Sequence, residues 1–233
     1  MSPSTPSSSL PKEIAMKKII VTITGPSTAG KTVFSDVLKE KGFLPVVSTT
    51  TRPIRAGEVH GEHYYFVTKE EFKRAQANQE LIEAVEYGGQ YYGVSAFEAE
   101  RIFEKGQPLV LVAEPSGTQQ IAEYCQQHGW DLIRVFVNNP LDVLMERILQ
   151  RFAEDIQGLD LGSEAYGKKL ETYKKRIADI AGYEQENWVK PAYDKRHPYD
   201  FIFDAFNASN KEQATEEVLR AVHALQFGKK IKP

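Results

Sequence analysis

The stretch that decides the fold reads GPSTAGKT and occupies residues 25–32. It follows a run rich in β-branched residues at 18–23 and precedes apolar residues at helical spacing, namely Val33, Phe34, Val37 and Leu38. The pattern G-x-x-x-x-G-K-T between a strand and a helix lets backbone N–H groups curl around a phosphate, while the lysine and the helix N-terminus add positive potential. We therefore predict a phosphate-binding loop whose ligand is a nucleoside triphosphate.

All residues of this loop are candidates for donor binding. They are Gly25, Pro26, Ser27, Thr28, Ala29, Gly30, Lys31 and Thr32. Glycine is needed where a side chain would block the turn. The Lys31 ammonium is expected to face the phosphates, and the Thr32 hydroxyl is expected to bind Mg²⁺ as the cofactor.

Composition limits the class of protein. The chain has 233 residues and 41% apolar content, enough for one sizeable core with insertions. Its 29 basic and 32 acidic residues give a net charge of -3, which argues against a nucleic-acid polymer or an anionic membrane as partner. The single cysteine, Cys125, suits a reducing compartment and a position in the core. We expect a cytoplasmic protein, monomeric or homodimeric, that acts on small anions.

Strand and helix patterns alternate along most of the chain, as is typical of a parallel sheet covered on both faces. The expected core strands are 18–23, 44–47, 109–113, 132–137 and 201–203. Helix-start patterns include Ser95 with Glu98 and Ser209 with Glu212. Residues 1–15 are rich in Ser and Pro, so we expect a disordered leader there.

Two stretches interrupt the alternation. Short strands at 64–67, 82–87 and 90–93, with a small helix capped by Thr68 and Glu71, predict a β-rich insert. A polar, glycine-containing stretch that begins at Arg151 runs into a long charged helix and has the character of a lid. The expected domain layout is a core at 16–47 and 96–233, with the lid at about 147–190 and the insert at 48–95.

The insert begins with STTTRPIRAGEVHGEHYYF, residues 48–66. This stretch places Arg52, Arg55 and Glu58 near several hydroxyl groups, with Tyr64 a few residues further along. Arginine side chains bind phosphate oxygens bidentately, and tyrosine hydroxyls add donors. Each of these residues alone would be ordinary surface or packing. Their concentration beside a phosphate-binding loop predicts a second phosphate site.

At this point the sequence resembles the guanylate kinases. The stretch at 48–66 and a second one, LIEAVEYGGQYYGVS at 81–95, are similar to that family's two acceptor-binding motifs. The resemblance extends from about 18 to 137. It implies an α/β, three-layer P-loop kinase with a parallel sheet core, a small β-rich acceptor-binding insert and a helical lid. The implied reaction moves the γ-phosphoryl of ATP, as co-substrate, to GMP or dGMP.

The resemblance also implies roles for individual residues. The acceptor phosphate would be held by Arg52, Arg55, Tyr64 and Tyr92, with Glu58 as a further acceptor-site residue. The guanine base would be read by Ser48, Glu83 and Glu114. The cations that act on the transferring phosphoryl group would be Lys31, Arg52, Arg147, Arg151 and Arg176.

Elementary chemistry agrees with these roles. Two unit charges about 5 Å apart repel by roughly 3 kcal/mol at an effective dielectric of 20, so a site that joins two phosphates must be dense in cations. Positioned donors can then carry most of the catalysis without a covalent intermediate. A carboxylate such as that of Glu83 can accept both the ring N–H and the exocyclic amine of guanine, a pair that adenine does not offer.

Departures from the family pattern leave alternatives open. Where the family carries two aspartates at a strand end, this chain has Val112 and Glu114, and Asp204 stands near a position where the family uses an Asn-Asp pair. The acceptor could therefore be a different or modified purine (deoxy)nucleoside monophosphate. A non-catalytic guanylate-kinase-like binding module would predict a degraded loop, and a sugar-phosphate kinase would predict loss of the arginine and base-reading residues. Neither loss is seen in this sequence.

Overall fold

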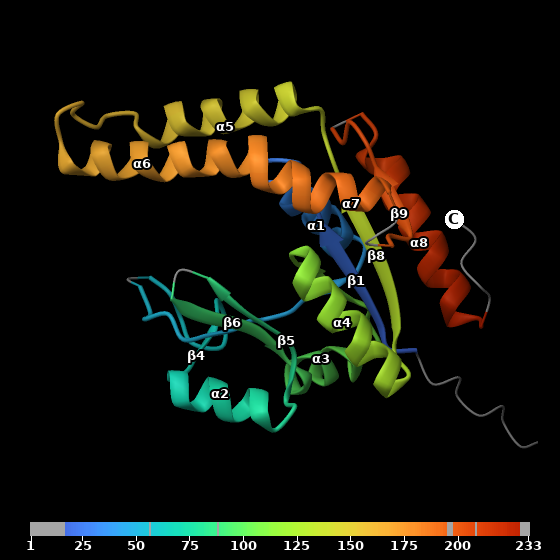
Figure 1. Ribbon diagram of the computed structural model, residues 1–233. Helices are drawn as coiled ribbons and strands as arrows, with labels where there is room; N and C mark the ends of the chain where they lie inside the picture. The colour runs from blue at the N-terminus through green and yellow to red at the C-terminus, as the bar shows by residue number, and fades with distance from the viewer. Residues whose placement is uncertain (1–16, 56, 88, 195–197, 208, 229–233) are drawn as a thin grey trace, which may run out of the picture.

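A computed structural model describes residues 17–55, 57–87, 89–194, 198–207 and 209–228. The leader predicted at 1–15 lies outside these residues. A five-stranded sheet runs in the order β2-β7-β1-β8-β9, and all its neighbouring strands are parallel (Figure 1). Its strands are β1 (Ile19–Thr24), β2 (Leu44–Pro45), β7 (Leu109–Val112), β8 (Asp131–Val137) and β9 (Phe201–Phe203). The predicted parallel α/β core is confirmed.

One core strand is shorter than predicted. We expected a strand over 44–47, but β2 ends at Pro45. The backbone N–H of Val47 donates to the Glu98 carboxylate (3.3 Å) and not to a neighbouring strand. The chain therefore leaves the sheet early and turns toward the insert.

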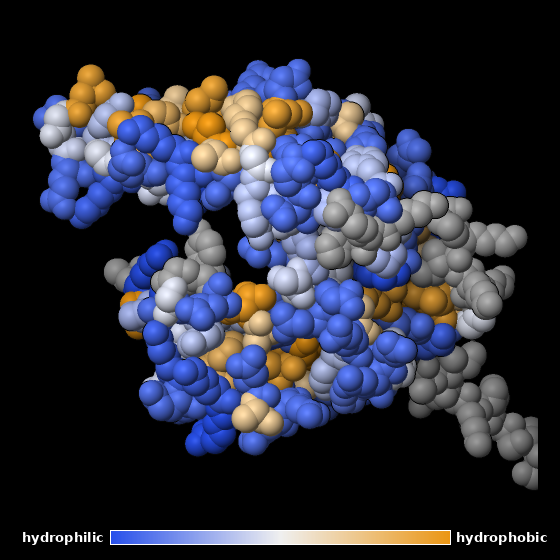
Figure 2. Space-filling model, viewed as in Figure 1, coloured by the Kyte–Doolittle hydropathy of each residue, from blue (hydrophilic) through white to orange (hydrophobic). Residues whose placement is uncertain are grey.

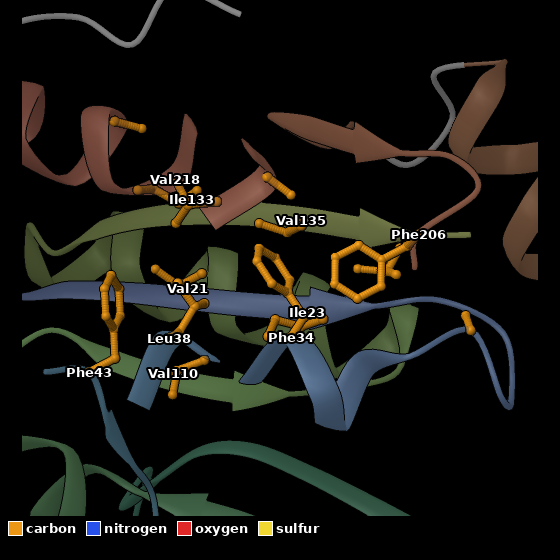
Figure 3. Packing of buried hydrophobic residues seen from close by; sticks show 14 of the residues in the cluster. Val21, Ile23, Phe34, Leu38, Phe43, Val110, Ile133, Val135, Phe206 and Val218 are labelled. Carbon is orange, nitrogen blue, oxygen red and sulfur yellow. The ribbon is translucent and has the colours of Figure 1, made fainter. Parts of the chain in front are cut away.

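Alternate residues of β1 face two separate cores. Val21 and Ile23 pack among α1 (Lys31–Glu40), α5 (Leu141–Asp155) and α8 (Lys211–Gln226). Figure 3 shows both beside Phe34 and Leu38 of α1. Ile20 faces the other way, toward α3 (Ala96–Phe103) and α4 (Pro115–His128). The second core contains Cys125, whose thiol pKa is raised by burial to about 12, so its predicted role as a core residue is confirmed. The sheet is thus the middle of three layers.

A second, four-stranded sheet in the order β4-β3-β6-β5 forms the insert. Its elements are β3 (Thr49–Thr50), β4 (Tyr65–Phe66), α2 (Lys69–Ala77), β5 (Leu81–Tyr87) and β6 (Gln90–Ser95). The predicted capping box of Thr68 and Glu71 starts α2. On α4, the Gln120 amide accepts from the N–H of Ala84 (3.0 Å) and donates to its carbonyl (3.2 Å), which fastens β5 to the core.

The helices α5 and α6 (Glu164–Ala178) form a helical arm that projects away from the sheet, above the insert in Figure 1. Phe152 on α5 contacts the rings of Tyr166 and Tyr173 on α6, and the Tyr173 hydroxyl donates to Asp155 (2.9 Å). After α6 the chain continues as two π-helical segments, η1 (Asp179–Tyr183) and η2 (Gln185–Val189), and then α7 (Lys190–Tyr193). Much of the stretch expected to form the lid is therefore helical.

The last helix does not begin as predicted. We expected Ser209 with Glu212 to open it, but α8 begins at Lys211 after Asn210. The Ser209 hydroxyl is bonded to the Asn207 side chain (2.5 Å), so it is not free to cap the helix. Within the part of the chain that the structure describes, no helix combines the length and the apolar character needed to cross a membrane.

Candidate functional site

The loop at 25–32 links β1 to α1 at the carboxyl edge of the sheet, where ligands bind in open α/β folds. Glycine is required at two of its positions. A Cβ on Gly25 would lie 2.0 Å from the Val137 carbonyl oxygen, and one on Gly30 would lie 2.9 Å from the Phe206 ring. With no side chain at these positions, the loop backbone can approach Val137 and Phe206 closely.

A cavity of about 1010 Å³ opens over this loop, and we call it the donor cavity. Its lining includes Ser27, Thr28, Gly30, Lys31 and Thr32 from the loop. Arg147 and Arg151 on α5 and Arg176 on α6 line it too, together with Glu114, which follows β7. The structure therefore brings the predicted donor loop and three predicted arginines into one space.

The loop is held in place from α5. Arg147 donates to the carbonyls of Thr28 (3.1 Å) and Phe206 (3.2 Å). The Thr28 hydroxyl donates to the Leu144 carbonyl (3.0 Å), and Thr28 itself has a left-handed backbone with φ 65. In this conformation the Arg147 guanidinium is therefore engaged in supporting the loop, whereas Arg151 and Arg176 are exposed within the donor cavity.

Lys31 is folded back on its own loop. Its ammonium donates to the carbonyls of Gly25 and Pro26, both at 2.8 Å. Burial lowers the pKa of Lys31 to about 8, while the carboxylates of Glu184 and Glu114 act in the opposite direction. The side chain thus remains mainly protonated at neutral pH and supplies the positive charge expected of it.

A residue that the sequence did not single out reaches into the loop. The Glu184 carboxylate accepts from the Ser27 N–H (2.8 Å) and from the Ser27 hydroxyl (2.7 Å). Phe206 and Asn207, which follow β9, also line the donor cavity. No motif marks Glu184, because its direction depends on the π-helical turns on either side of it.

Several predicted acceptor residues form one cluster on the insert. Arg52 makes a bidentate ion pair with Glu58 (2.7 and 3.0 Å) and a hydrogen bond with Tyr92, and its guanidinium lies 5.4 Å from the centre of the Tyr64 ring. The hydrogen bond from Arg52 is the main reason why the pKa of Glu58 falls to about 2. Arg55 donates its backbone N–H to Glu58 (2.8 Å) and is otherwise exposed. The cluster is therefore organised around one arginine and one carboxylate.

The predicted base-reading residues lie on three separate segments of the chain. The Ser48 carbonyl accepts from the Tyr65 N–H (2.9 Å), which joins Ser48 to β4 of the insert. Glu83, on β5, is 8% exposed, and burial together with the charge of Glu114 raises its pKa to about 7. A Cβ on Gly117 would lie 2.4 Å from the Glu83 Oε1, so glycine at the start of α4 makes room for this carboxylate.

Glu114 lies between the donor cavity and Glu83 in its electrostatic interactions. It precedes α4 and lines the donor cavity. Burial and the charge of Glu184 raise the pKa of Glu114, whereas Lys31 lowers it. Because Glu114 also raises the pKa of Glu83, it lies within electrostatic reach of both Lys31 on the loop and the side chain predicted to read the base.

The donor cavity and the insert are apart in this conformation. Figure 2 shows the molecule hollowed between the helical arm and the insert. Among the described residues, the lining of the donor cavity includes none of Ser48, Arg52, Arg55, Glu58, Tyr64, Glu83 and Tyr92. Val112, at the end of β7 and two residues before Glu114, is 40% exposed. Asp204 accepts a hydrogen bond from the Tyr193 hydroxyl and does not line the donor cavity either.

Few protein side chains near the loop could bind a metal ion. No group of three or more His, Cys, Asp or Glu side chains in the described ranges could hold a metal ion. Thr32 is exposed and lines the donor cavity. Since Mg²⁺ is usually bound through few protein groups plus substrate phosphates, the Thr32 hydroxyl fits a metal that arrives with its ligand.

Comparison with known proteins decides the family. The family model described as guanylate kinase matches residues 16–179. The chain belongs to the guanylate kinase family. A guanylate kinase from Synechocystis sp. is 37% identical over 145 residues, which is 60% of this chain and 73% of that protein. One from Clostridium perfringens is 34% identical over 175 residues, which is 74% of this chain and 79% of that protein.

The three-dimensional comparison agrees with this guanylate kinase family assignment at the level of the fold. The crystal structure of guanylate kinase from Anaplasma phagocytophilum has a TM-score of 0.56 and 23% sequence identity to this chain. The match covers 91% of this chain and 87% of that one. The sequence-based prediction of the family and of a P-loop kinase fold is therefore confirmed.

Proposed function

We propose that this guanylate kinase family member transfers the γ-phosphoryl group of ATP to GMP or dGMP, giving ADP and GDP or dGDP. One observation carries the proposal. Lys31 and the phosphate-binding loop share a cavity with Arg151 and Arg176, and Glu114 links that cavity electrostatically to the buried carboxylate of Glu83. A candidate purine-reading group thus lies within electrostatic reach of a residue that lines the proposed donor site.

On the donor side, the loop N–H groups and Lys31 would bind the β- and γ-phosphates. Thr32 would hold Mg²⁺, which neutralises phosphate charge when bound. Arg151 and Arg176 would stabilise the phosphoryl group in transfer, and Arg147 would keep the loop in shape through Thr28. Transfer needs no nucleophilic side chain, because the acceptor's own phosphate oxygen attacks.

On the acceptor side, the Arg52 guanidinium would exchange Glu58 for the phosphate of the acceptor. Tyr64 and Tyr92 lie beside it and would add hydroxyl donors. Glu83 would accept the ring N–H and exocyclic amine of guanine, and its burial makes that pair of hydrogen bonds strong and selective.

The reaction requires the two sides to approach. Reacting atoms must come within roughly 3 to 3.5 Å, and water must be excluded from the phosphates. We assign the acceptor-binding role to the insert at 48–95, the lid role to about 147–190 and the donor core to 16–47 and the remainder of 96–233. Closure of the hollow in Figure 2 would bring Arg52 toward the donor loop.

A second candidate acceptor is a modified purine (deoxy)nucleoside monophosphate. The observation that favours it is Val112, which presents an apolar side chain at the end of β7, two residues before Glu114. An apolar substituent on the base or sugar could contact the Val112 side chain favourably. It would contact an aspartate at the same position less favourably.

A coupled assay tests the proposal with ATP, Mg²⁺ and a panel of GMP, dGMP, IMP, AMP and base-modified guanine nucleotides. We expect GMP or dGMP to be phosphorylated at least about a hundredfold more efficiently than AMP. Preference for a modified guanine nucleotide over both would favour the second candidate. Absence of transfer to every guanine nucleotide would overturn the proposal and leave a non-catalytic binding module.

A further inference from the structure

A buried carboxylate is bonded to the loop that we propose binds the donor phosphates. Glu184 is 5% exposed, and both of its carboxylate oxygens are bonded to Ser27, at 2.8 Å to the N–H and 2.7 Å to the hydroxyl. We call this N–H and hydroxyl pair the Ser27 anion site. Glu184 is separated from it by 157 positions in the sequence, so the contact depends on the tertiary fold.

The surroundings of the contact are those of an anion-binding site. Lys31 lies within electrostatic reach of Glu184, and the loop lies before the N-terminus of α1. Hydrogen bonds from N–H and O–H groups to a carboxylate are charge-assisted and about twice as strong as neutral ones. Phosphate oxygens use the same donors. A donor phosphate and the Glu184 carboxylate therefore cannot both occupy the Ser27 anion site.

The backbone around Glu184 offers a way to withdraw it. Glu184 lies between η1 and η2, where hydrogen bonds close wider turns than in an α-helix. Successive residues of an α-helix are rotated by about 100°, so loss of one extra residue from such a turn would rotate the side chain away from the loop. Gly182, in η1, has open space around its missing Cβ, which leaves room for the turn to change.

We propose that Glu184 competes with the donor phosphate for the Ser27 anion site: it occupies the site in the empty protein and leaves it when the donor binds. The proposal rests on the assignment of the loop as the donor site. It adds a function for η1 and η2, because a change at the loop would be transmitted to the base of the helical arm. Lid closure would then follow donor binding through one displaced side chain.

Competition of this kind lowers apparent donor affinity. The measured dissociation constant equals the intrinsic one divided by the fraction of molecules whose site is free. Glu184→Gln keeps the size of the side chain but replaces the charge-assisted contact with a neutral one. The variant should therefore bind a polyphosphate more tightly than the unchanged protein.

Calorimetric titration of the full chain with inorganic tripolyphosphate tests this prediction, because that probe has neither base nor acceptor. We expect Glu184→Gln to lower its dissociation constant by at least about fivefold. Glu186→Gln is the matched control, since it removes the same charge two residues away on an exposed, Lys190-paired side chain, and should leave the constant unchanged. An equal or higher constant in Glu184→Gln would overturn the proposal.

A second control separates competition from general repulsion. Glu154 lines the same cavity and bonds to Gln150, so Glu154→Gln removes a negative charge without touching Ser27. Its effect should stay below about twofold. Tightening as large as that of Glu184→Gln would mean that charge alone is responsible, and the proposal would be wrong.

Hydrogen exchange of the unchanged protein gives a readout independent of any variant. Tripolyphosphate should speed amide exchange at 179–189, because displaced Glu184 no longer anchors these turns. Unaltered or slower exchange there, with the probe bound, would contradict displacement. Failure of the GMP assay would leave these outcomes intact, so the two proposals are distinguishable.

Discussion

The proposed donor loop and the proposed acceptor insert differ in where the carboxylate bonded to their phosphate-binding groups comes from. Each has cationic or N–H groups that we propose bind a phosphate, and in this structure a carboxylate is bonded to those groups. On the insert the carboxylate is local, since Glu58 is six residues from its partner Arg52. On the loop it is remote, since Glu184 comes from beyond the helical arm. A local partner preserves the shape of a site, whereas a remote partner couples the site to another part of the fold.

The two regions also differ in their support. The donor loop joins a fully buried central strand to α1 and is held by Arg147 and by Asn139, whose amide donates to the Ala29 carbonyl (2.9 Å). In the insert, two of the four strands, β3 and β4, have only two residues each. Short strands form few backbone hydrogen bonds, so we expect the proposed closure to move the insert more than the donor loop.

The largest effect on activity should come from a substitution in the donor loop. Lys31→Ala is expected to lower kcat/KM by at least about a hundredfold, on the order of 3 kcal/mol, because it removes a cation from the phosphates. Lys39→Ala, on the same helix in an exposed pair with Asp36, is the control and should change little. The coupled assay measures both, and near-normal turnover in Lys31→Ala would contradict its role.

The next largest effect should come from a substitution in the insert and should change only the KM for the acceptor. Arg52→Ala is expected to raise the KM for GMP by about ten- to a hundredfold, since charge-assisted hydrogen bonds contribute about 1.5 to 3 kcal/mol each. The KM for ATP should be unchanged. Arg74→Ala, an exposed residue on α2, serves as the control. Equal changes in both KM values would mean that Arg52 does not belong to the acceptor side alone.

Glu83→Gln should reduce discrimination between GMP and AMP by roughly 1 to 3 kcal/mol, because a neutral amide cannot accept both guanine donors. Competition experiments with the two nucleotides measure this ratio. An unchanged ratio would remove Glu83 from the base-reading role.

The same variant should alter stability as a function of pH. The pKa of Glu83 is raised from 4.5 to about 7 in the folded protein, so its contribution to stability is fully present below pH 4.5 and is lost as pH rises through about 7. Above that pH, Glu83→Gln should be more stable than the unchanged protein by on the order of 2 to 3 kcal/mol. Urea unfolding at pH 5 and pH 8 measures the difference. Equal stabilities at pH 8 would show that burial of the charge costs little.

The smallest effect should come from Gly117→Ala, which adds a methyl group where Glu83 Oε1 would lie 2.4 Å away. The carboxylate must shift, so discrimination should fall by about 1 kcal/mol. Gly167→Ala, in α6 with open space around its Cβ, is the matched control and should be neutral or slightly stabilising. A loss of discrimination in both variants would point to a general effect of alanine.

Local patterns predicted much of the core. The loop glycines, the run of β1 and the box of Thr68 and Glu71 each specify their own geometry, and the structure has them where the sequence indicated. Patterns could not predict that Ser209 would bond to Asn207 and so fail to cap α8, because that bond depends on the conformation of the loop after β9.

The sequence predicted which residues belong to the candidate site, but it did not predict many of the contacts that they make. Arg147 donates to the Thr28 and Phe206 carbonyls because of the way α5 packs on the loop, and the sequence does not show this packing. The position of Glu184 depends on π-helical turns, for which the sequence carries no clear signal. The roles of the acceptor and donor residues remain predictions that the variants above test.

The bonds between Gln120 and Ala84 have a consequence for solubility. β5 is the outer strand of the four-stranded sheet, and an outer strand with free N–H and C=O groups can pair with another molecule. One glutamine side chain satisfies both groups of Ala84 and so interrupts that template. Loss of this amide would leave both Ala84 groups free for strand addition, and concentrated solutions would then be prone to self-association.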